Sequence, residues 1–329
     1  MSVTIPHVGI AKDQRAAELA LEALAPLERG THQIEVGRSS LRVSNLHKVL
    51  YPEFGFTKLD LLRSYARLAP AVLAHGRGRP LTLKRYPDGV DAEFFFQKRV
   101  PAKHPEWVNV TEPIGDQQVN YATLDDVRTL LWAANLGSIE LHVLLARHTT
   151  VQQPTALVYD LDPGDGAGIV ECCAVAQIVR DLFRHFDLDS YAKTSGSKGV
   201  QVYVPLNKPS ITYEQTKPLS KAVAELLAAE HPDLIVSRQL KTLRRGKVLI
   251  DWSQNDPSKT TICAYSLRAR NQPRVSTPVT WDEVAETADG TDQESLRFET
   301  DDVVARLEQH GDLFEPVLKQ RQSLPNLDF

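Results

Sequence analysis

The sequence has few cysteines, no long apolar run and only a small excess of charge of one sign, and each shortage excludes a class of protein. Its 329 residues include only Cys172, Cys173 and Cys263, two of them adjacent and the third distant. This spacing forms neither a disulfide framework nor a CxxC zinc motif, so we expect structural cysteines and a reducing compartment. No stretch reaches the roughly 18 to 20 apolar residues of a membrane span, and the first residues lack the apolar segment of a secretory signal. We therefore expect a cytoplasmic protein with no membrane partner.

The composition is that of a folded chain, with 42% apolar and 24% charged residues. The length suffices for about two units of roughly 150 residues. A formal net charge of −4 hides a segregation, because residues 282–329 carry 13 acidic and 4 basic residues and the rest of the chain is net positive. Arg238 to Lys247 holds five cations and no acid. Such a stretch suits a polyanion, although a solvated basic face has the same composition.

Hydrophobic periodicity and turn residues predict a mixture of hairpins and helices, which favours an α+β fold over strictly alternating βα units. Thr57, with Asp60 three residues later, is typical of a helix N-cap. The expected elements are helices over 13–27, 58–76, 121–137, 169–186 and 212–229, a hairpin over 34–45, and strands around 80–87, 92–98, 107–113, 155–159, 191–206 and 247–251. We divide the chain into an N-terminal helical extension (1–35) and a catalytic region (36–329), with subregions 36–150 and 151–275 and an acidic segment over 282–329.

Three aspartates follow apolar strands and form the strongest chemical signal. Asp160 and Asp162 are two residues apart, and side chains at i and i+2 of a strand point to the same face. Asp251 follows Val248–Ile250 in the same way. Carboxylates brought together raise one another's pKa unless a divalent cation binds them, and such an oxygen cluster serves two-metal phosphoryl transfer. DPGDG is also a good turn sequence, and D-x-D occurs in metal-dependent glycosyltransferases and in phosphatases, so the pair alone leaves these alternatives open.

The segment 194–199, TSGSKG, lies between two predicted strands. Its glycines allow positive φ, and its hydroxyls, amides and Lys198 can bind a phosphate. The spacing is not that of a Walker loop, and an ordinary hairpin turn remains an alternative.

The ordered motifs DLDPG (160–164), TSGSKG (194–199) and KVLIDWSQN (247–255), followed by KTTICAYSLRAR (259–270), resemble the polymerase domain of bacterial ligase D. That domain belongs to the archaeo-eukaryotic primase superfamily. The resemblance begins at HKVLYP (47–52) and continues into the tail, and no KxDG ligase motif is present. We expect a stand-alone paralogue with the primase-polymerase fold, in which central, mostly antiparallel sheets are flanked by helices.

The resemblance implies roles for individual residues. Asp160, Asp162 and Asp251 would bind two divalent metals, Mn²⁺ or Mg²⁺, for attack of a primer 3′-hydroxyl on the α-phosphate of a nucleotide. The residues that would bind the incoming nucleotide are His142, Ser195, Lys198, Gln201, Gln254, Arg268, Phe95 and Phe96. In an apolar context, His142 alone would more often be structural.

Further positions match the family's DNA contacts or depart from its pattern. Phe95 and Phe96 match a pair that stacks on bases, and three consecutive Phe in a strand cannot all face one core. Lys48 and Lys58 match a pocket for the 5′-phosphate of the downstream strand. Gln201 stands where the family commonly has a histidine, and because glutamine carries no positive charge, triphosphate affinity or its pH dependence would differ.

The function implied is a DNA-dependent nucleotidyltransferase that adds rNTPs or dNTPs at gaps or breaks during repair. Its partners would be 5′-phosphorylated gapped or broken DNA, nucleotides, and a Ku-like protein or a separate DNA ligase, at the bacterial nucleoid. Two alternatives remain open, a catalytically weak DNA-binding module and a D-x-D sugar-nucleotide transferase. Concentrated carboxylates beside DNA disfavour the first, and the basic stretches disfavour the second.

Overall fold

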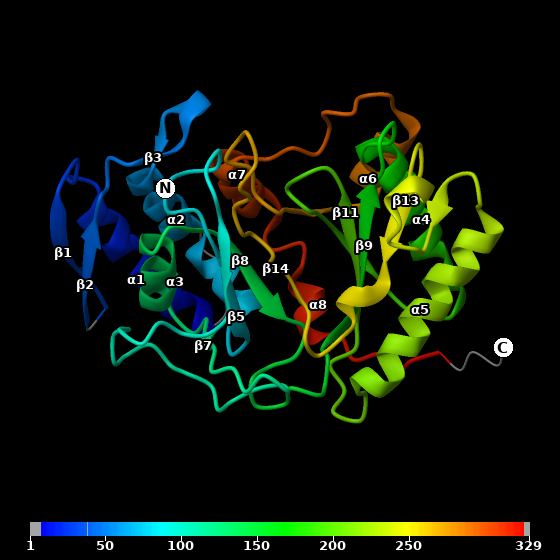
Figure 1. Cartoon of the computed structure of the whole chain (residues 1–329), viewed down its shortest axis with the longest axis horizontal. Helices are drawn as coiled ribbons and strands as arrows, with labels where there is room; N and C mark the ends of the chain where they lie inside the picture. Colours follow the sequence, from blue (N-terminus) through cyan, green and yellow to red (C-terminus); the bar gives the residue numbers. More distant parts are fainter. Residues whose placement is uncertain (1–7, 38, 326–329) are drawn as a thin grey trace. The chain divides into compact units, whose positions relative to one another are not determined.

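A computed structural model describes residues 8–37 and 39–325 of the chain (Figure 1). The chain forms two compact units. Unit 1 comprises the chain up to Val143 with Ile262–Ser276 and Phe298–Asp312. Unit 2 comprises Leu144–Thr261, Thr277–Arg297 and the chain from Leu313 onward. No helix in the described part of the chain is both long enough and apolar enough to cross a membrane.

Unit 1 combines antiparallel sheets with helices. Its main sheet has the order β14-β8-β5-β6, with β7 also paired to β5. The strands of this sheet are β5 (Pro80–Arg85), β6 (Phe95–Gln97), β7 (Ala122–Thr123), β8 (Ser138–Leu144) and β14 (Thr260–Ile262). Unit 1 includes β8 up to Val143 and only the last residue of β14, Ile262. Two hairpins, β1 (Thr31–Val36) with β2 (Ser39–Ser44) and β3 (Val49–Tyr51) with β4 (Phe56–Thr57), precede this sheet. A short 3₁₀ helix, η1 (Pro52–Phe54), lies between β3 and β4.

The long helix α2 (Lys58–Gly76) forms the centre of the helical part of unit 1. It begins at a capping box in which the Thr57 hydroxyl accepts from the Asp60 N–H and the Asp60 carboxylate accepts from the Thr57 N–H. This start is the one that the sequence predicted. The helices packed against α2 are α1 (Val8–Leu24), α3 (Val127–Asn135) and α7 (Thr300–His310).

Unit 2 is built on a six-stranded sheet of order β12-β13-β9-β11-β10-β15, antiparallel except for the β12–β13 pair. The strands are β9 (Ala156–Pro163), β10 (Tyr191–Thr194), β11 (Val200–Pro205), β12 (Ile235–Val236), β13 (Val248–Asp251) and β15 (Pro278–Val279). The helices are α4 (Ile169–His185), α5 (Tyr213–Glu230), α6 (Trp281–Asp289) and α8 (Glu315–Lys319), with 3₁₀ helices η2 (Lys241–Leu243) and η3 (Trp252–Gln254).

The two faces of this sheet differ in character. Figure 1 shows α4 and α5 on the same side of the sheet. Tyr159 of β9 turns toward that side, where its ring contacts Phe183 of α4. Because side chains alternate along a strand, Asp160 and Asp162 point to the opposite side. That side of β11 carries Tyr203, whose ring contacts Phe314 at the start of α8.

Three expectations about secondary structure were wrong. The helix expected over 121–137 begins only at Val127, because Ala122–Thr123 forms β7 and Asp126 is the N-cap of α3. The first helix covers Val8–Leu24 rather than 13–27, and it ends before Pro26 because a residue preceding proline disfavours the α conformation. The segment 107–113 forms no strand; it contributes only an isolated bridge between Val110 and Ala122. Prolines at 105 and 113 bound this segment, and proline has no N–H to donate to a ladder.

Candidate active site

A row of four polar side chains crosses the sheet of unit 2. Asp251 lies directly opposite Asp160, Asp160 opposite Gln201, and Gln201 opposite Lys193. Directly opposed residues in antiparallel strands project to the same face, so the four side chains are neighbours there. Asp162 adds a third carboxylate to this face, two residues along β9. The sheet register therefore gathers the three predicted carboxylates on one face.

The environment of Asp160 disfavours its charged form. Its Oδ1 atom is buried and has no hydrogen-bond partner in the described part of the chain. The pKa of Asp160 is raised to about 7, mainly by burial and then by repulsion from Asp162 and, more weakly, from Asp251. A hydrogen bond from Gln201 and the charge of Lys193 act in the opposite direction. An added cation would relieve this repulsion. Lys193, which belongs to the same row, is fully buried. It was not singled out from the sequence, because its only distinguishing feature was a charged residue within a predicted strand.

The chemistry of the donor set fits a hard divalent cation, although the side chains do not enclose one. Within residues 8–37 and 39–325, no group of three His, Cys, Asp or Glu side chains has the arrangement of a metal site. Asp251 instead accepts hydrogen bonds from Ser253 N at 2.9 Å and Gln254 Nε2 at 3.3 Å, as the N-cap of η3. The three-carboxylate metal site therefore stays a prediction. Carboxylate oxygens are nevertheless the ligands that Mg²⁺ and Mn²⁺ prefer, and the orphaned Asp160 oxygen supplies one.

The TSGSKG segment forms the tight turn between β10 and β11. The Ser195 Oγ atom accepts hydrogen bonds from the backbone amides of Ser197 and Gly199, each at 3.2 Å, so these two amides serve the turn itself. A Cβ atom at Gly199 would lie 2.0 Å from the Leu161 carbonyl oxygen, which requires glycine where the turn approaches β9. Lys198 is exposed at the tip. The turn thus holds a solvent-accessible lysine next to the strand that carries the aspartates.

Gln201, which departs from the family pattern, is buried in a polar cluster of unit 2. Its Nε2 atom donates to the Thr261 hydroxyl at 3.2 Å, and the hydroxyl of Tyr203 lies 3.5 Å from its Oε1 atom. Gln254, on η3, also has one buried oxygen, Oε1, without a partner in the described part of the chain. Gln201 therefore presents a neutral amide to Asp160, its directly opposed neighbour on β9.

In unit 1, His142 and Arg268 meet at a carboxylate that the sequence reasoning did not single out. His142 lies on β8, and its Nε2 atom is 2.9 Å from Oε2 of Glu140 on the same strand. The Arg268 Nη1 atom is 3.4 Å from that oxygen. Burial lowers the pKa of His142, because its effect is larger than the opposing effect of the Glu140 hydrogen bond and charge. The i, i+2 spacing of Glu140 and His142 in the sequence IELHV was the available signal.

Phe95 and Phe96 are exposed on β6 beside charged side chains. Phe94, Phe95 and Phe96 are each about half exposed, so the expectation that they do not share one core is confirmed. The guanidinium of Arg85 lies 5.0 Å from the Phe95 ring centroid, and the Phe96 ring meets His142 edge-on at 5.9 Å. Exposed aromatic faces of this kind can stack on bases.

Lys48 and Lys58 lie together. The Lys58 backbone N–H donates to the Lys48 carbonyl at 2.8 Å, across the β3–β4 hairpin. The Lys48 ammonium pairs with Asp88 at 2.6 Å, whereas Lys58 is buried. Burial, followed by the positive charges of Lys48 and Arg85, lowers the pKa of Lys58 to about 8. Three cations at one place favour an anionic ligand.

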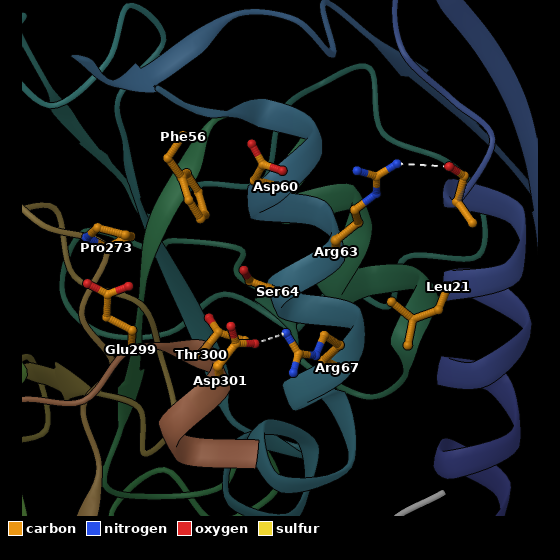
Figure 2. A pocket seen from close by; sticks show the side chains of 11 residues that line it. Leu21, Phe56, Asp60, Arg63, Ser64, Arg67, Pro273, Glu299, Thr300 and Asp301 are labelled. Atoms are coloured by element: carbon orange, nitrogen blue, oxygen red, sulfur yellow. Dashed lines mark hydrogen bonds and ion pairs between the residues drawn. The ribbon is translucent and has the colours of Figure 1, made fainter. Parts of the chain in front are cut away.

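Unit 1 also contains a cavity of about 680 Å³, lined by none of the predicted site residues (Figure 2). It lies where α1 ends beside α2 and the first turn of α7. Figure 2 shows Arg67 paired with Asp301. Arg63 donates to the Ala25 carbonyl. Arg63 also donates to the carbonyls of Leu24 and Leu27. Arg63 thus joins the end of α1 to α2, whereas the Arg67–Asp301 pair joins α2 to α7.

Comparison with known proteins identifies the family. The family model of the LigD primase-polymerase domain matches residues 57–314. The chain belongs to the LigD primase-polymerase family. It is 40% identical over 282 residues to the multifunctional non-homologous end joining protein LigD of Mycolicibacterium smegmatis, which covers 84% of this chain and 36% of that protein. It is 30% identical over 288 residues to the bifunctional LigD of Bacillus subtilis, covering 87% and 45%.

A solved LigD structure has the same fold. The polymerase domain of Mycobacterium tuberculosis ligase D in complex with DNA matches with a TM-score of 0.77 and 38% identity, over 86% of this chain and 99% of that one. The predicted resemblance and the predicted fold, with mostly antiparallel sheets and helices, are confirmed. LigD primase-polymerase domains are nucleotidyltransferases, as the sequence predicted for this chain. The chain spans little more than a third of the first curated relatives that it matches.

Proposed function

We propose that this LigD-type domain adds rNTPs or dNTPs to a primer 3′-hydroxyl at DNA gaps or breaks, in repair by non-homologous end joining. The observation that carries the proposal is the cross-strand row in which Asp160 opposes Asp251, with Asp162 on the same face, in a member of this family. An unpartnered, buried carboxylate oxygen is costly in an unliganded protein and useful in one that binds cations.

Asp160, Asp162 and Asp251 would hold two Mn²⁺ or Mg²⁺ ions, which when bound stabilise the negative charge of the reacting phosphoryl group. Asp251 would exchange its hydrogen bonds with Ser253 and Gln254 for this role. On the same unit, Lys198 would bind the nucleotide phosphates, and Ser195, Gln201 and Gln254 would position them. Lys193 would balance part of the carboxylate charge.

Unit 1 would contribute the remaining recognition of substrate. His142 and Arg268 would bind the nucleotide, and Phe95 and Phe96 would stack on bases. Lys48 and Lys58 would bind a 5′-phosphate, for which the cluster with Arg85 supplies positive charge. A Ku-like protein and a separate DNA ligase are the partners we propose, and the cytoplasm, at the nucleoid, is the proposed location.

The proposal is tested by filling of a short gap in DNA whose downstream strand ends in either a 5′-phosphate or a 5′-hydroxyl, with Mn²⁺ and rNTPs or dNTPs. We expect extension by the wild type, faster with the 5′-phosphate, and loss of that difference in Lys48→Ala/Lys58→Ala. Lys221→Ala, an exposed lysine of α5, is the matched control. Tight binding of gapped DNA without any extension would instead indicate a binding module, and neither binding nor extension would point to a different substrate.

A further inference from the structure

Glu140 is the most completely enclosed carboxylate near the residues assigned to nucleotide binding. Its side chain, on β8, is only 1% exposed. A buried carboxylate is stable only when its charge and lone pairs are satisfied. In this case both oxygens have partners, and those partners come from three parts of unit 1.

Each oxygen of Glu140 contacts two of these partners. Oε1 accepts from the Ala269 backbone N–H at 3.1 Å and lies 3.4 Å from the Lys84 ammonium, which belongs to the residue directly opposite on β5. Oε2 lies 2.9 Å from Nε2 of His142 and 3.4 Å from Nη1 of Arg268. One carboxylate thus contacts β5, β8 and the segment that carries Arg268.

Glu140 remains negatively charged in this setting. Burial alone would raise its pKa, but the hydrogen bond from His142 and the charges of Arg268, His142 and Lys84 outweigh burial and lower the pKa to about 2. Without that charge, the Lys84 ammonium and the Arg268 guanidinium would repel each other with no anion between them. Arg268 also depends on Glu140 for its backbone position, through the Ala269 N–H.

The contact with His142 also selects a tautomer. An ionised carboxylate only accepts hydrogen bonds, so the ring nitrogen that it contacts must carry the proton. Glu140 therefore places the proton on Nε2 of His142 and leaves Nδ1 as the acceptor of the neutral ring. The Nε atom of Arg268 is buried and has no hydrogen-bond partner in the described chain, so it retains a donor.

We propose that Glu140 is a positioning residue that fixes the tautomer of His142 and the guanidinium of Arg268 for nucleotide binding. The inference rests on the proposed function, in which His142 and Arg268 contact the nucleotide. Glu140 itself contacts no substrate in this account. It acts by presenting an acceptor at His142 Nδ1 and a donor at Arg268 Nε in fixed positions before the nucleotide arrives.

The test compares Glu140→Gln and Glu140→Asp with the wild type in Mn²⁺-dependent primer extension. Glutamine keeps the size of the side chain and removes its charge, whereas aspartate keeps the charge and withdraws it by one methylene. We expect Glu140→Gln to raise the nucleotide KM at least tenfold, with kcat changed less than threefold, and Glu140→Asp to recover part of the loss. Asp13→Asn is the matched control, because Asp13 is also a buried carboxylate of unit 1 paired with an arginine, Arg77.

A second measurement does not depend on catalysis, and its wild-type part needs no variant. The ¹⁵N shifts of the His142 ring in the wild type report which nitrogen carries the proton, and we expect Nε2–H. In Glu140→Gln we expect this preference to weaken and the pKa of His142 to fall, because its nearest anion is gone while Lys84 and Arg268 remain.

Each outcome decides the matter. An Nδ1–H tautomer in the wild type, or an unchanged nucleotide KM in a folded Glu140→Gln protein, would overturn the positioning role. A KM rise of the same size in Asp13→Asn would overturn it as well, because the effect would then be general destabilisation. If the wild type itself extends no primer, the proposed function fails, and the ring ¹⁵N shifts still decide whether Glu140 sets the tautomer.

Discussion

Asp160 on β9 lies directly opposite Asp251 on β13, so two carboxylates face each other across adjacent antiparallel strands. Like charges in this relationship destabilise a sheet. The sheet keeps them although Asp162 adds a third carboxylate to the same face. We interpret this repulsion between carboxylates as a loss of folding stability that the protein tolerates because the site binds cations.

The first prediction concerns the stability of the metal-free protein. Asp160→Asn should raise the free energy of unfolding by about 1–3 kcal/mol at pH 8, because it removes a charge whose folded-state pKa lies near 7 instead of 3.8. The folded state binds the Asp160 proton more tightly than the unfolded state does. The free energy of unfolding of the wild type therefore decreases as the pH rises from about 4 to 7, whereas asparagine does not titrate and the variant should not show this decrease. Urea unfolding in EDTA at pH 5 and pH 8 measures the difference.

Asp165→Asn, an exposed aspartate in the turn after β9, is the control and should change stability little at either pH. Equal stability of Asp160→Asn and wild type at pH 8 would show that the carboxylates do not repel one another in the folded protein.

The second prediction is a pH dependence at Lys58. Its pKa of about 8 means that the ammonium is charged below pH 8 and loses its charge above it. The preference for a 5′-phosphorylated gap over a 5′-hydroxyl gap should therefore be full at pH 7 and fall by about three- to tenfold by pH 9. Competition binding with the two DNAs over this range gives the preference directly. Lys58→Arg should hold it constant, since arginine stays charged; a wild-type preference that does not change between pH 7 and 9 would refute the assignment.

The third prediction separates binding from stability at Phe96. Its side chain is 54% exposed, so Phe96→Ala should leave the thermal midpoint within about 2 °C of the wild type. Base stacking on an aromatic ring is worth about 1–3 kcal/mol, so affinity for DNA with an unpaired template base should fall by about 5- to 150-fold. Fluorescence anisotropy measures the affinity. Phe96→Trp should retain most of it, and an undiminished affinity in Phe96→Ala would exclude stacking at this position.

The fourth prediction concerns the attachment of α1 in unit 1. Arg63 donates to three carbonyls at the end of that helix, so Arg63→Ala should leave these acceptors without their donor and cost about 1–3 kcal/mol locally. Amide hydrogen exchange over residues 11–27 should accelerate, while exchange over β9 and β11 stays unchanged. Uniform acceleration throughout the protein would mean that α1 is no separate unit of stability.

The sequence predicted local geometry more reliably than contacts between segments that are distant along the chain. Because strand alternation has a period of two, the sequence places Asp160 and Asp162 on one face. That Asp251 opposes Asp160 depends on the β9–β13 register, which joins segments about ninety residues apart. The capping box at Thr57 was predictable for the opposite reason, since all its atoms lie within four residues.

Lys193 was missed because a single charge within a strand gives no indication of its partners. Glu140 was missed because its i, i+2 spacing from His142 does not reveal its contacts with Lys84 and Arg268. Glu140 is buried only because Lys84, His142 and Arg268 surround it, and Arg268 is more than a hundred residues away.

The central claim is that the three aspartates support metal-dependent nucleotidyl transfer. The most direct measurement is single-turnover extension of a labelled primer on gapped DNA with Mn²⁺ and nucleotide, comparing the wild type with Asp160→Asn/Asp162→Asn. Our account predicts extension by the wild type, its loss on addition of EDTA, and a rate at least a thousandfold lower in the double variant with DNA affinity retained. Extension by the double variant at the wild-type rate would contradict it.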